Sequence, residues 1–265
     1  MTNRVAEWKI RTKTLSLREP VFMGIVNVTP DSFSDGGRFF DVPAAVDRAL
    51  ELIESGAGII DLGGESTRPG SDGVDVAEEL WRVIPALTAI LEAMPKDGIV
   101  PVSVDTTKAE VARETMAAGA EIVNDVSPVT SAEMVRVLLE TGAGYVLMHS
   151  LGMPKTMQHD PRYKNVVEDV FDNLHRRRLE LIAAGVEPEK IAVDPGLGFG
   201  KTTEHNRTLV ENIERFHDLG SPVLVGHSRK RFIAETFADR DEGTRIVTKK
   251  LLDKGVQIIR VHQIR

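Results

Sequence analysis

The sequence predicts an α/β protein with the architecture of a (β/α)8 barrel, also called a TIM barrel. Eight short apolar segments rich in β-branched residues recur along the chain, and segments with helical periodicity separate them. Eight such units in 265 residues match the usual size of this barrel. A doubly wound parallel sheet has the same local pattern and is the competing architecture. The number and even spacing of the units favour the barrel.

The eight predicted strands are nearly continuous apolar runs, as expected for a parallel sheet that is covered on both faces. They span residues 22–28, 58–63, 100–105, 121–125, 144–149, 191–196, 222–226 and 256–261. The clearest helical patterns cover residues 42–56 and 107–120. Glycines stand where helices should end in the left-handed conformation, at Gly56, Gly119, Gly142, Gly185 and Gly255.

The first twenty residues do not share the repeated pattern. Trp8, Ile10 and Thr12 alternate with Lys9, Arg11 and Lys13. This alternation predicts a small hairpin or edge strand that plugs one end of the barrel. We therefore expect an N-terminal extension at residues 1–20 and one barrel domain at residues 21–265.

The composition excludes several classes of protein. No apolar run approaches the roughly 18 residues of a membrane span, and the N-terminus lacks the apolar core of a signal peptide. The absence of cysteine excludes disulfides and thiolate metal sites, and it fits a cytoplasmic protein. A net charge of −7 argues against a general nucleic-acid binder.

Polar residues follow each predicted strand at its C-terminal end. They are Asn27, Asp61, Asp105, Asn124 with Asp125, His149, Asp194, Ser228 to Lys230, and Arg260 with His262. In a parallel barrel these ends share one face, which is where active sites of this fold lie. A single Asp or Asn here is more simply a helix N-cap or turn residue. Eight coincident occurrences indicate an enzyme.

Two kinds of chemistry are expected at this face. A local group of basic side chains suits an anion such as a phosphate ester; it comprises Arg68, Arg229, Lys230, Arg260 and His262. Asp105, Asn124 and Asp194 can instead accept hydrogen bonds from the ring N–H groups of a flat polar heterocycle. The long loops at residues 27–39 and 61–74 either close over a substrate or are disordered surface loops.

Other motifs give weaker indications. Residues 195–202, PGLGFGKT, resemble a phosphate-binding P-loop, but Pro195 stands where that motif needs its first glycine. The seven histidines show no HExxH spacing, so no zinc site is indicated. The basic run from His175 to Arg178 lies on a predicted helix, and we expect it to form a solvated face.

Several segments resemble the signature segments of the dihydropteroate synthases, which are pterin-binding TIM-barrel enzymes. The longest are MGIVNVTPDSFSDGG at residues 23–37 and IIDLGGESTRPG at residues 59–70. The likeness continues in order through VSVDT, IVNDVS, MHSLGMPKTMQ, DPGLGFGKT, GHSRKRF and RVH. It therefore extends from the first barrel strand to the last.

The resemblance implies a transferase of folate biosynthesis. Members of this family condense 7,8-dihydropterin-6-ylmethyl diphosphate with 4-aminobenzoate, and form 7,8-dihydropteroate and pyrophosphate with Mg2+ as cofactor. They are the targets of sulfonamides. The implied partners are therefore small molecules, and the implied catalytic residues are Asp105, Asp194, Lys230, Arg260 and His262.

The resemblance also implies which residues bind each part of the substrates. The pterin pocket would consist of Asp105, Asn124, Met148, Asp194, Phe199 and Lys230. The diphosphate would be held by Thr67, Arg68, Arg260 and His262. The aminobenzoate slot, where sulfonamides bind, would include Phe33 and Pro69. Asn27 would be the protein ligand of Mg2+, with Asp31 or Asp35 as a second candidate.

The end of the chain departs from the family pattern. Gln263 stands where the family usually has an acidic residue, and the final helix of the barrel is expected to be missing. Its loss would expose apolar surface between the first and last helices, which a homodimer or the N-terminal segment would cover. Arg231 also stands where several members carry Ser against the aminobenzoate carboxylate.

Two other functions are compatible with parts of the sequence. A methyltetrahydrofolate-binding protein of the corrinoid methyltransferase type would bind the pterin with the same residues. Its substrate has no diphosphate, however, so Arg68 and Arg260 argue against this function. A non-catalytic pterin-binding homologue is supported only by the altered C-terminus.

Overall fold

The computed structural model describes residues 4–29, 41–66, 71, 73–95, 100–152 and 160–264. Several residues named above lie outside these ranges: Asp31, Phe33, Asp35, Thr67, Arg68 and Pro69.

All eight predicted barrel strands are present. They are β3 (Val21–Asn27), β4 (Ala57–Gly63), β5 (Val102–Asp105), β6 (Ile122–Asp125), β7 (Gly144–Met148), β8 (Ile191–Asp194), β9 (Leu224–Gly226) and β10 (Ile258–Val261). The α-helices are α1 (Val42–Glu54), α2 (Val76–Ala93), α3 (Ala109–Ala117), α4 (Ala132–Thr141), α5 (Val166–Ala183), α6 (Thr203–Glu211), α7 (Arg231–Thr236) and α8 (Arg240–Asp253). Two 3-10 helices, η1 (Pro188–Lys190) and η2 (Ile213–Leu219), precede β8 and β9.

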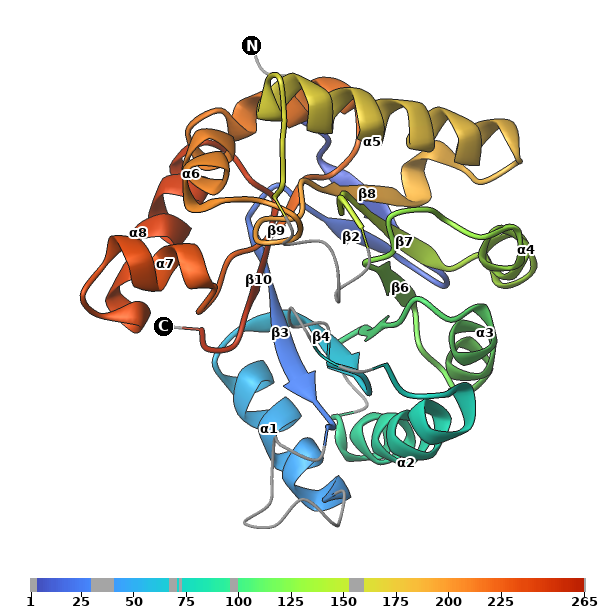
Figure 1. Cartoon of the computed structure of the whole chain (residues 1–265). Coiled ribbons are helices and arrows are strands. Elements are labelled where there is room, and N and C mark those ends of the chain that lie inside the picture. Colours follow the sequence, from blue (N-terminus) through green and yellow to red (C-terminus); the bar gives the residue numbers. More distant parts are fainter. Residues whose placement is uncertain are drawn as a thin grey trace.

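The sheet closes on itself, with the helices arranged around it (Figure 1). The order of the strands is β8-β7-β6-β5-β4-β3-β10-β9, so β3 pairs with β10 from the other end of the chain. A parallel bridge between Val193 and Val223 joins β8 to the segment that leads into β9. The predicted barrel is therefore confirmed, and the doubly wound alternative is wrong.

Local signals fix where the helices begin and end. The side chains of Asp41, Asp75 and Ser131 accept hydrogen bonds from backbone N–H groups in the first turns of α1, α2 and α4. The predicted helix-ending glycines all have positive φ, between 66° and 110°: Gly56, Gly119, Gly142, Gly185 and Gly255. These glycines therefore end their helices as the sequence predicts.

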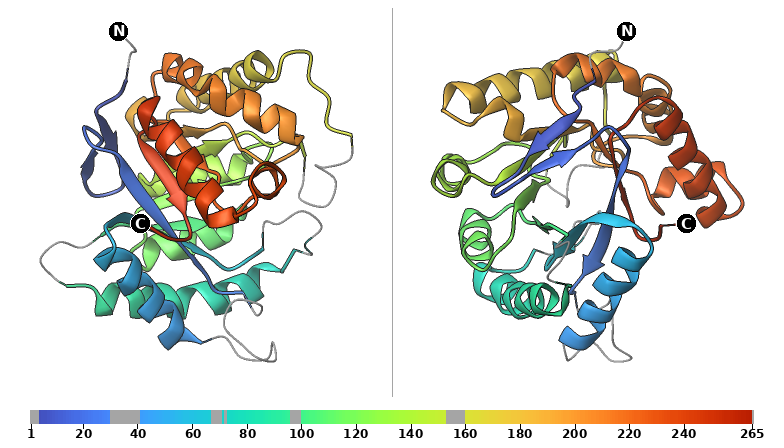
Figure 2. Two further views of the ribbon diagram at one scale, coloured as in Figure 1. Left: turned by 90° about the vertical axis from the view of Figure 1, so that its left-hand side faces the viewer. Right: turned by 180° about the vertical axis from the view of Figure 1, so that it is seen from behind.

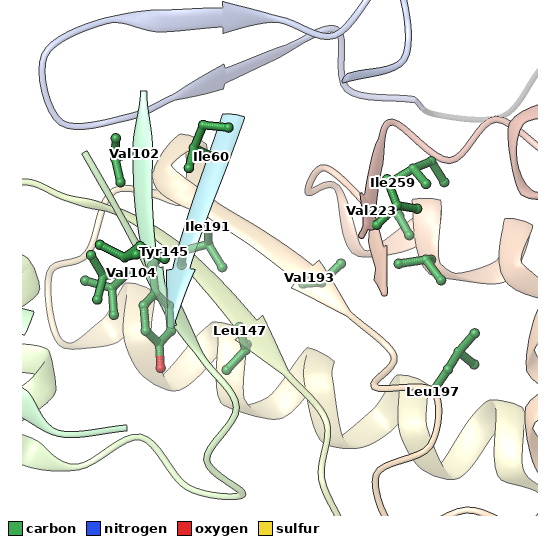
Figure 3. Packing of buried hydrophobic residues seen from close by; sticks show 14 of the residues in the cluster. Ile60, Val102, Val104, Tyr145, Leu147, Ile191, Val193, Leu197, Val223 and Ile259 are labelled. Carbon is green, nitrogen blue, oxygen red and sulfur yellow. The ribbon is translucent and has the colours of Figure 1, made fainter. Parts of the chain in front are cut away.

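Outward-facing strand residues form the layer between the sheet and the helices. Val104 on β5 and Leu147 and Tyr145 on β7 are among the residues that fill this layer (Figure 3). Tyr145 is fully buried, and its hydroxyl donates to Asp125 Oδ2 at 2.7 Å. The strands are thus covered by apolar side chains on their outer face, as the continuous apolar runs predict.

The interior of the barrel has an apolar layer at the N-terminal end of the strands. Its residues are Met23, Ile59, Ile122, Val146, Ala192, Leu224 and Ile258. Trp8, Ile10 and Leu17 of the N-terminal segment pack in the same cluster, and each is at most 3% exposed. Water is therefore excluded from this end of the barrel.

The N-terminal segment is the predicted hairpin. Strands β1 (Glu7–Lys9) and β2 (Thr14–Ser16) are antiparallel and lie across the end of the barrel that Figure 2 (right) shows from behind. The indole Nε1 of Trp8 donates to the carbonyl oxygen of Lys190 at 2.9 Å. The large ring is thus buried with its polar atom satisfied.

The described residues after β10 are 262–264, and no helix follows the strand there. Arg48 on α1 donates to the carbonyl oxygen of His262, and Ile264 packs against the apolar core. Gln263 and Ile264 line a groove of about 220 Å³ beside α1. The apolar surface expected here is therefore partly covered by the chain itself.

No helix in the described ranges has the length and apolar character that a membrane crossing requires.

Removal of the buried Trp8 indole should destabilise the protein without changing the face at the C-terminal ends of the barrel strands. We expect Trp8→Ala to lower the free energy of unfolding by about 3–5 kcal/mol, because it leaves a large apolar cavity. Urea denaturation followed by circular dichroism measures this loss. Trp81, the second tryptophan, is 61% exposed, and Trp81→Ala should change stability by at most about 0.5 kcal/mol. Equal losses of unfolding free energy in the two variants would contradict the conclusion that Trp8 closes the end of the barrel.

Candidate active site

A polar layer lies inside the barrel directly above the apolar layer. Strand side chains that point to the same face are two residues apart. Asp61 therefore follows Ile59, Asn124 follows Ile122, and Arg260 follows Ile258 on the interior face. Asp61 and Arg260 lie within their strands and not at the strand ends, where the sequence placed them.

Arg260 lies between two carboxylates at the centre of this layer. Its Nε donates to Asp61 Oδ2 at 2.6 Å, and its Nη2 donates to Asp105 Oδ2 at 2.8 Å. Asn124 Nδ2 also donates to Asp61 Oδ2, at 3.1 Å. Arg260 and Asn124 are thus joined through Asp61, and Asp105 is joined to them through Arg260. Asp61 is fully buried; the sequence placed it at the end of a strand, but the resemblance gave it no role in binding or catalysis.

Burial raises the pKa values of carboxylates in the polar layer. Loss of hydration raises the pKa of Asp105 to about 7; the positive charge of Arg260 opposes this shift and the negative charge of Asp61 adds to it. Burial also raises the pKa of Asp194, against the opposing effect of Lys230. The Oδ1 atoms of Asp61 and Asp105 are buried and accept no hydrogen bond from the described residues. Such acceptors are suited to N–H donors from a ligand.

Lys230 and an apolar wall border the same space. The ammonium of Lys230 donates to the carbonyl oxygen of Leu197 and lies 4.6 Å from the ring centroid of Phe199. Phe199 packs with Met148 and Val126 in a small buried cluster. Desolvation lowers the pKa of Lys230 to about 8. The predicted pterin residues Met148, Phe199 and Lys230 are therefore brought together.

The other basic residues of this face separate into two groups. His262 remains at the site, where its Nδ1 lies 3.0 Å from Ser228 Oγ. Arg229 instead pairs with Asp241 on α8 at 3.0 Å, and Arg231 pairs with Glu235 at 2.6 Å. The side chain of Arg231 is 84% exposed. The prediction that Arg229 contributes to the positive group is therefore wrong, because its charge is used on the helical surface.

The prediction that residues 175–178 form a solvated face is wrong for Arg177. Arg177 is only 4% exposed, and it donates to the carbonyl oxygens of Met148 at 2.6 Å and Ser127 at 3.2 Å. It connects the last residue of β7 to the segment that follows β6. Its spacing from Leu174 and Leu181, at three and four residues, places it on the apolar stripe of α5. That stripe is the sequence signal that identifies it as buried.

A third charged group fixes the start of the loop after β4. Lys108 forms ion pairs with Glu65 and with Glu79, whose side chain is fully buried on α2. Arg82 donates to the carbonyl oxygen of Gly64 at 2.9 Å. A Cβ on Gly64 would collide with Val83. The described part of this loop, just before Thr67 and Arg68, is thus held firmly against α2.

Asn27 ends β3 beside the polar layer. A Cβ on Gly63 would lie 3.4 Å from Asn27 Oδ1 and 3.6 Å from Asp105 Cβ, so these two side chains border one space. The described ranges contain no group of three or more His, Asp or Glu side chains arranged for a metal. Mg2+ usually takes few protein oxygens, chiefly those of carboxylates, and completes its shell with substrate phosphates and water. An amide oxygen at this position fits such a site.

Comparisons with known proteins agree with this geometry. Residues 23–262 match the family described as pterin binding enzymes. The dihydropteroate synthase of Escherichia coli K12 is 44% identical over 260 residues, which cover 95% of this chain and 89% of the relative. The chain belongs to the dihydropteroate synthase family.

Solved structures of this family superpose closely on the protein. The Xanthomonas albilineans dihydropteroate synthase with 4-aminobenzoic acid gives a TM-score of 0.89 at 39% identity, and covers 98% of this chain and 93% of its own. The Yersinia pestis dihydropteroate synthase in a sulfonamide drug complex gives 0.89 at 38% identity, with coverages of 97% and 94%. Family membership, transferase class and fold are thus the ones that the sequence predicts.

The raised pKa of Asp105 makes a prediction about stability. The folded state keeps a proton that the unfolded state releases near pH 3.8, so the free energy of unfolding falls as pH rises from about 4 to about 7. The side chain of Asn cannot take up this proton, so the fall is absent in Asp105→Asn. The free energy of unfolding of the variant, relative to that of the unmodified protein, should therefore increase from about pH 4 to about pH 7 and stay constant above that pH.

Urea denaturation at a series of pH values measures this gain. Asp172→Asn on the exposed face of α5 is the control for a simple loss of negative charge. A gain that does not change with pH, or that Asp172→Asn reproduces, would contradict the assignment.

Proposed function

We propose that the protein is a dihydropteroate synthase that condenses 7,8-dihydropterin-6-ylmethyl diphosphate with 4-aminobenzoate, and forms 7,8-dihydropteroate and pyrophosphate. One observation carries the proposal: buried acceptors on Asp105, Asn124 and Asp194 share the barrel floor with the half-buried cation Lys230. This set matches the alternating donors and acceptors on the edge of a pterin ring.

The pterin would lie on the polar layer, between the apolar wall and Lys230. Carboxylates of Asp105 and Asp194 would accept hydrogen bonds from the ring N–H groups, and Asn124 would fix the ring in its plane. Lys230 would donate to an acceptor on the ring, while Met148 and Phe199 would cover one ring face. A site of this kind rejects analogues that leave its buried polar atoms unpaired.

The diphosphate would lie at the mouth of the barrel, near Arg260 and His262. Arg260 uses Nε and Nη2 on the floor, but its Nη1 makes no hydrogen bond to the described residues, and 17% of its side chain is exposed. That remaining edge can donate to an anion. Thr67 and Arg68 are proposed to complete the anion site from the loop after β4.

Mg2+ is the proposed cofactor, with Asn27 as its protein ligand and Asp31 or Asp35 as a candidate second ligand. When bound, it would neutralise charge on the diphosphate and favour the departure of pyrophosphate. The residues of this chain would do the rest. Arg260 and His262 would stabilise the leaving group, and the buried carboxylates would stabilise positive charge that develops on the pterin methylene carbon.

The bond changes follow from this arrangement. The C–O bond to the diphosphate breaks, and the amine nitrogen of 4-aminobenzoate forms the new C–N bond and loses a proton. Phe33 and Pro69 are proposed to shape the aminobenzoate slot. The related Xanthomonas enzyme binds 4-aminobenzoic acid and the Yersinia enzyme binds a sulfonamide, which supports such a slot. Closure of the two long loops would exclude water from the reacting carbon.

The proposal includes the organisation of the chain. Residues 21–265 would form the catalytic barrel, and residues 1–20 would serve as its structural extension. A homodimer in the cytoplasm is the proposed state.

A direct assay tests the reaction. Purified protein, the pterin diphosphate, 4-aminobenzoate and Mg2+ should release pyrophosphate and dihydropteroate in equal amounts. Chelation by EDTA should abolish release, and added Mg2+ should restore it. Pterin binding without any pyrophosphate release would instead support the non-catalytic homologue or the methyltransferase type.

Neighbouring basic residues provide a matched pair for the pterin site. We expect Lys230→Met to weaken binding of free 6-hydroxymethylpterin by roughly 10–100-fold, since a hydrogen bond from a charged group contributes about 1.5–3 kcal/mol. Arg229→Met removes an adjacent positive charge that pairs with Asp241 on the surface, and it should leave binding unchanged. Fluorescence titration measures both. Equal effects would indicate that only net charge matters.

A further inference from the structure

Lys201 has an unusual environment for a lysine. It ends the P-loop-like segment at residues 195–202, yet it is only 3% exposed. Its ammonium donates to the carbonyl oxygens of Gly196 at 2.9 Å and Phe199 at 3.0 Å, and it lies 2.8 Å from His149 Nδ1. An ammonium has three N–H donors. All three are therefore used within the protein, and none is left for a phosphate.

The histidine in this cluster is an acceptor. Burial and the charge of Lys201 lower the pKa of His149 to about 2, so the imidazole is neutral. Burial also lowers the pKa of Lys201, and the negative charge of Asp194 opposes this shift. The two carbonyl oxygens around Nζ require a donor, which Lys201 supplies. A neutral imidazole has one acceptor nitrogen, and Nδ1 faces Lys201. Lys201 thus connects the residue that follows β7 to the segment that follows β8.

The segment at residues 195–200 needs such a connection. It lies outside any strand or helix, and Gly196, Gly198 and Gly200 have φ of 66°, 84° and 64°. A Cβ on Gly196 would collide with the carbonyl oxygen of His149, so the segment lies directly against the end of β7. Buried carbonyl oxygens in an irregular segment require donors from elsewhere. Lys201 supplies two of them.

The same segment positions parts of the pterin site. Its Leu197 carbonyl oxygen accepts the hydrogen bond from Lys230, and its Phe199 ring faces the same ammonium. The N–H of Gly196 donates to Asp194 Oδ1 at 2.7 Å. A change in the path of this segment would therefore move the partners of both Lys230 and Asp194.

We propose that Lys201 is a positioning residue for the pterin site. Its buried ammonium holds the segment at residues 195–200 on the end of β7, and so fixes the Leu197 carbonyl and the Phe199 ring against Lys230. This role rests on the proposed function, because it takes Lys230 and Phe199 to contact the pterin. It also explains why the P-loop-like lysine is present without a phosphate to bind.

Substitution of Lys201 should affect one substrate and not the other. Lys201→Met keeps most of the volume but removes the ammonium. We expect the KM for the pterin diphosphate and the Kd for 6-hydroxymethylpterin to rise by roughly 10–100-fold, the range found when residues that orient the ligands of a metal are removed. The KM for 4-aminobenzoate should stay unchanged. Lys201→Gln keeps two donors for the carbonyls, so it should lose less pterin affinity than Lys201→Met. If Lys201→Met does not fold, Lys201→Cys takes its place.

Lys190 provides a matched control. It is also a buried lysine, at 8% exposure, and its ammonium donates to the carbonyl oxygen of Gly142 at 2.7 Å. It lies at the opposite end of the barrel, where its own carbonyl accepts the Trp8 indole. Lys190→Met should lower thermal stability while both KM values remain those of the parent. A merely structural role of Lys201 predicts the same behaviour for both variants.

Chemical rescue provides a further test. The protein contains no cysteine, so Lys201→Cys introduces a unique thiol. Alkylation with 2-bromoethylamine in denaturant, followed by refolding, converts it to a lysine analogue with a sulfur in the chain. The alkylated variant should regain pterin affinity, and parent protein taken through the same steps controls for refolding.

The outcomes are distinct. Parent-like pterin affinity in Lys201→Met, or in the unalkylated Lys201→Cys variant that takes its place, overturns the proposal, as does an alkylated variant that refolds but does not regain affinity. Pterin-specific loss with rescue supports it. Failure of the proposed function is recognised separately, because the unmodified protein would then release no pyrophosphate.

Discussion

The guanidinium of Arg260 holds the polar layer of the barrel together. It connects Asp61 on β4 and Asp105 on β5 to β10, and Asn124 on β6 reaches the same Asp61 oxygen. Without this cation, adjacent buried carboxylates would face one another at high electrostatic cost. The arrangement is possible because the apolar layer and Trp8 close the barrel beneath it, so these charges meet only the open face.

Positive side chains also organise the loops around this centre. Lys108 fixes the start of the loop after β4, Arg177 joins the segment after β6 to the end of β7, and Lys201 holds the segment after β8. Each of these cations has carboxylate or backbone carbonyl oxygens as partners. The loops that carry the candidate site are thus held by specific polar contacts, whereas apolar packing defines the barrel below them.

Much of this could be predicted from the sequence, because strand periodicity and strand-end polarity are local properties. They located all eight barrel strands and placed Asp105, Asn124 and Asp194 on one face. The pairing of Arg260 with Asp61 could not be predicted in this way, since the residues are 199 positions apart and meet only through strand register. Arg229 and Arg177 show the same limit: which cation faces the site and which is used elsewhere depends on tertiary partners.

The close approach of Gly196 to β7 has a consequence for inhibitor resistance. A substitution can exclude an inhibitor by adding a side chain to the space that the inhibitor fills. At Gly196 the left-handed backbone and the nearby His149 carbonyl leave no room for any side chain. Gly196 is buried, and its N–H orients Asp194. A substitution here would therefore disturb the proposed pterin site itself, so the protein cannot use this position to exclude an inhibitor.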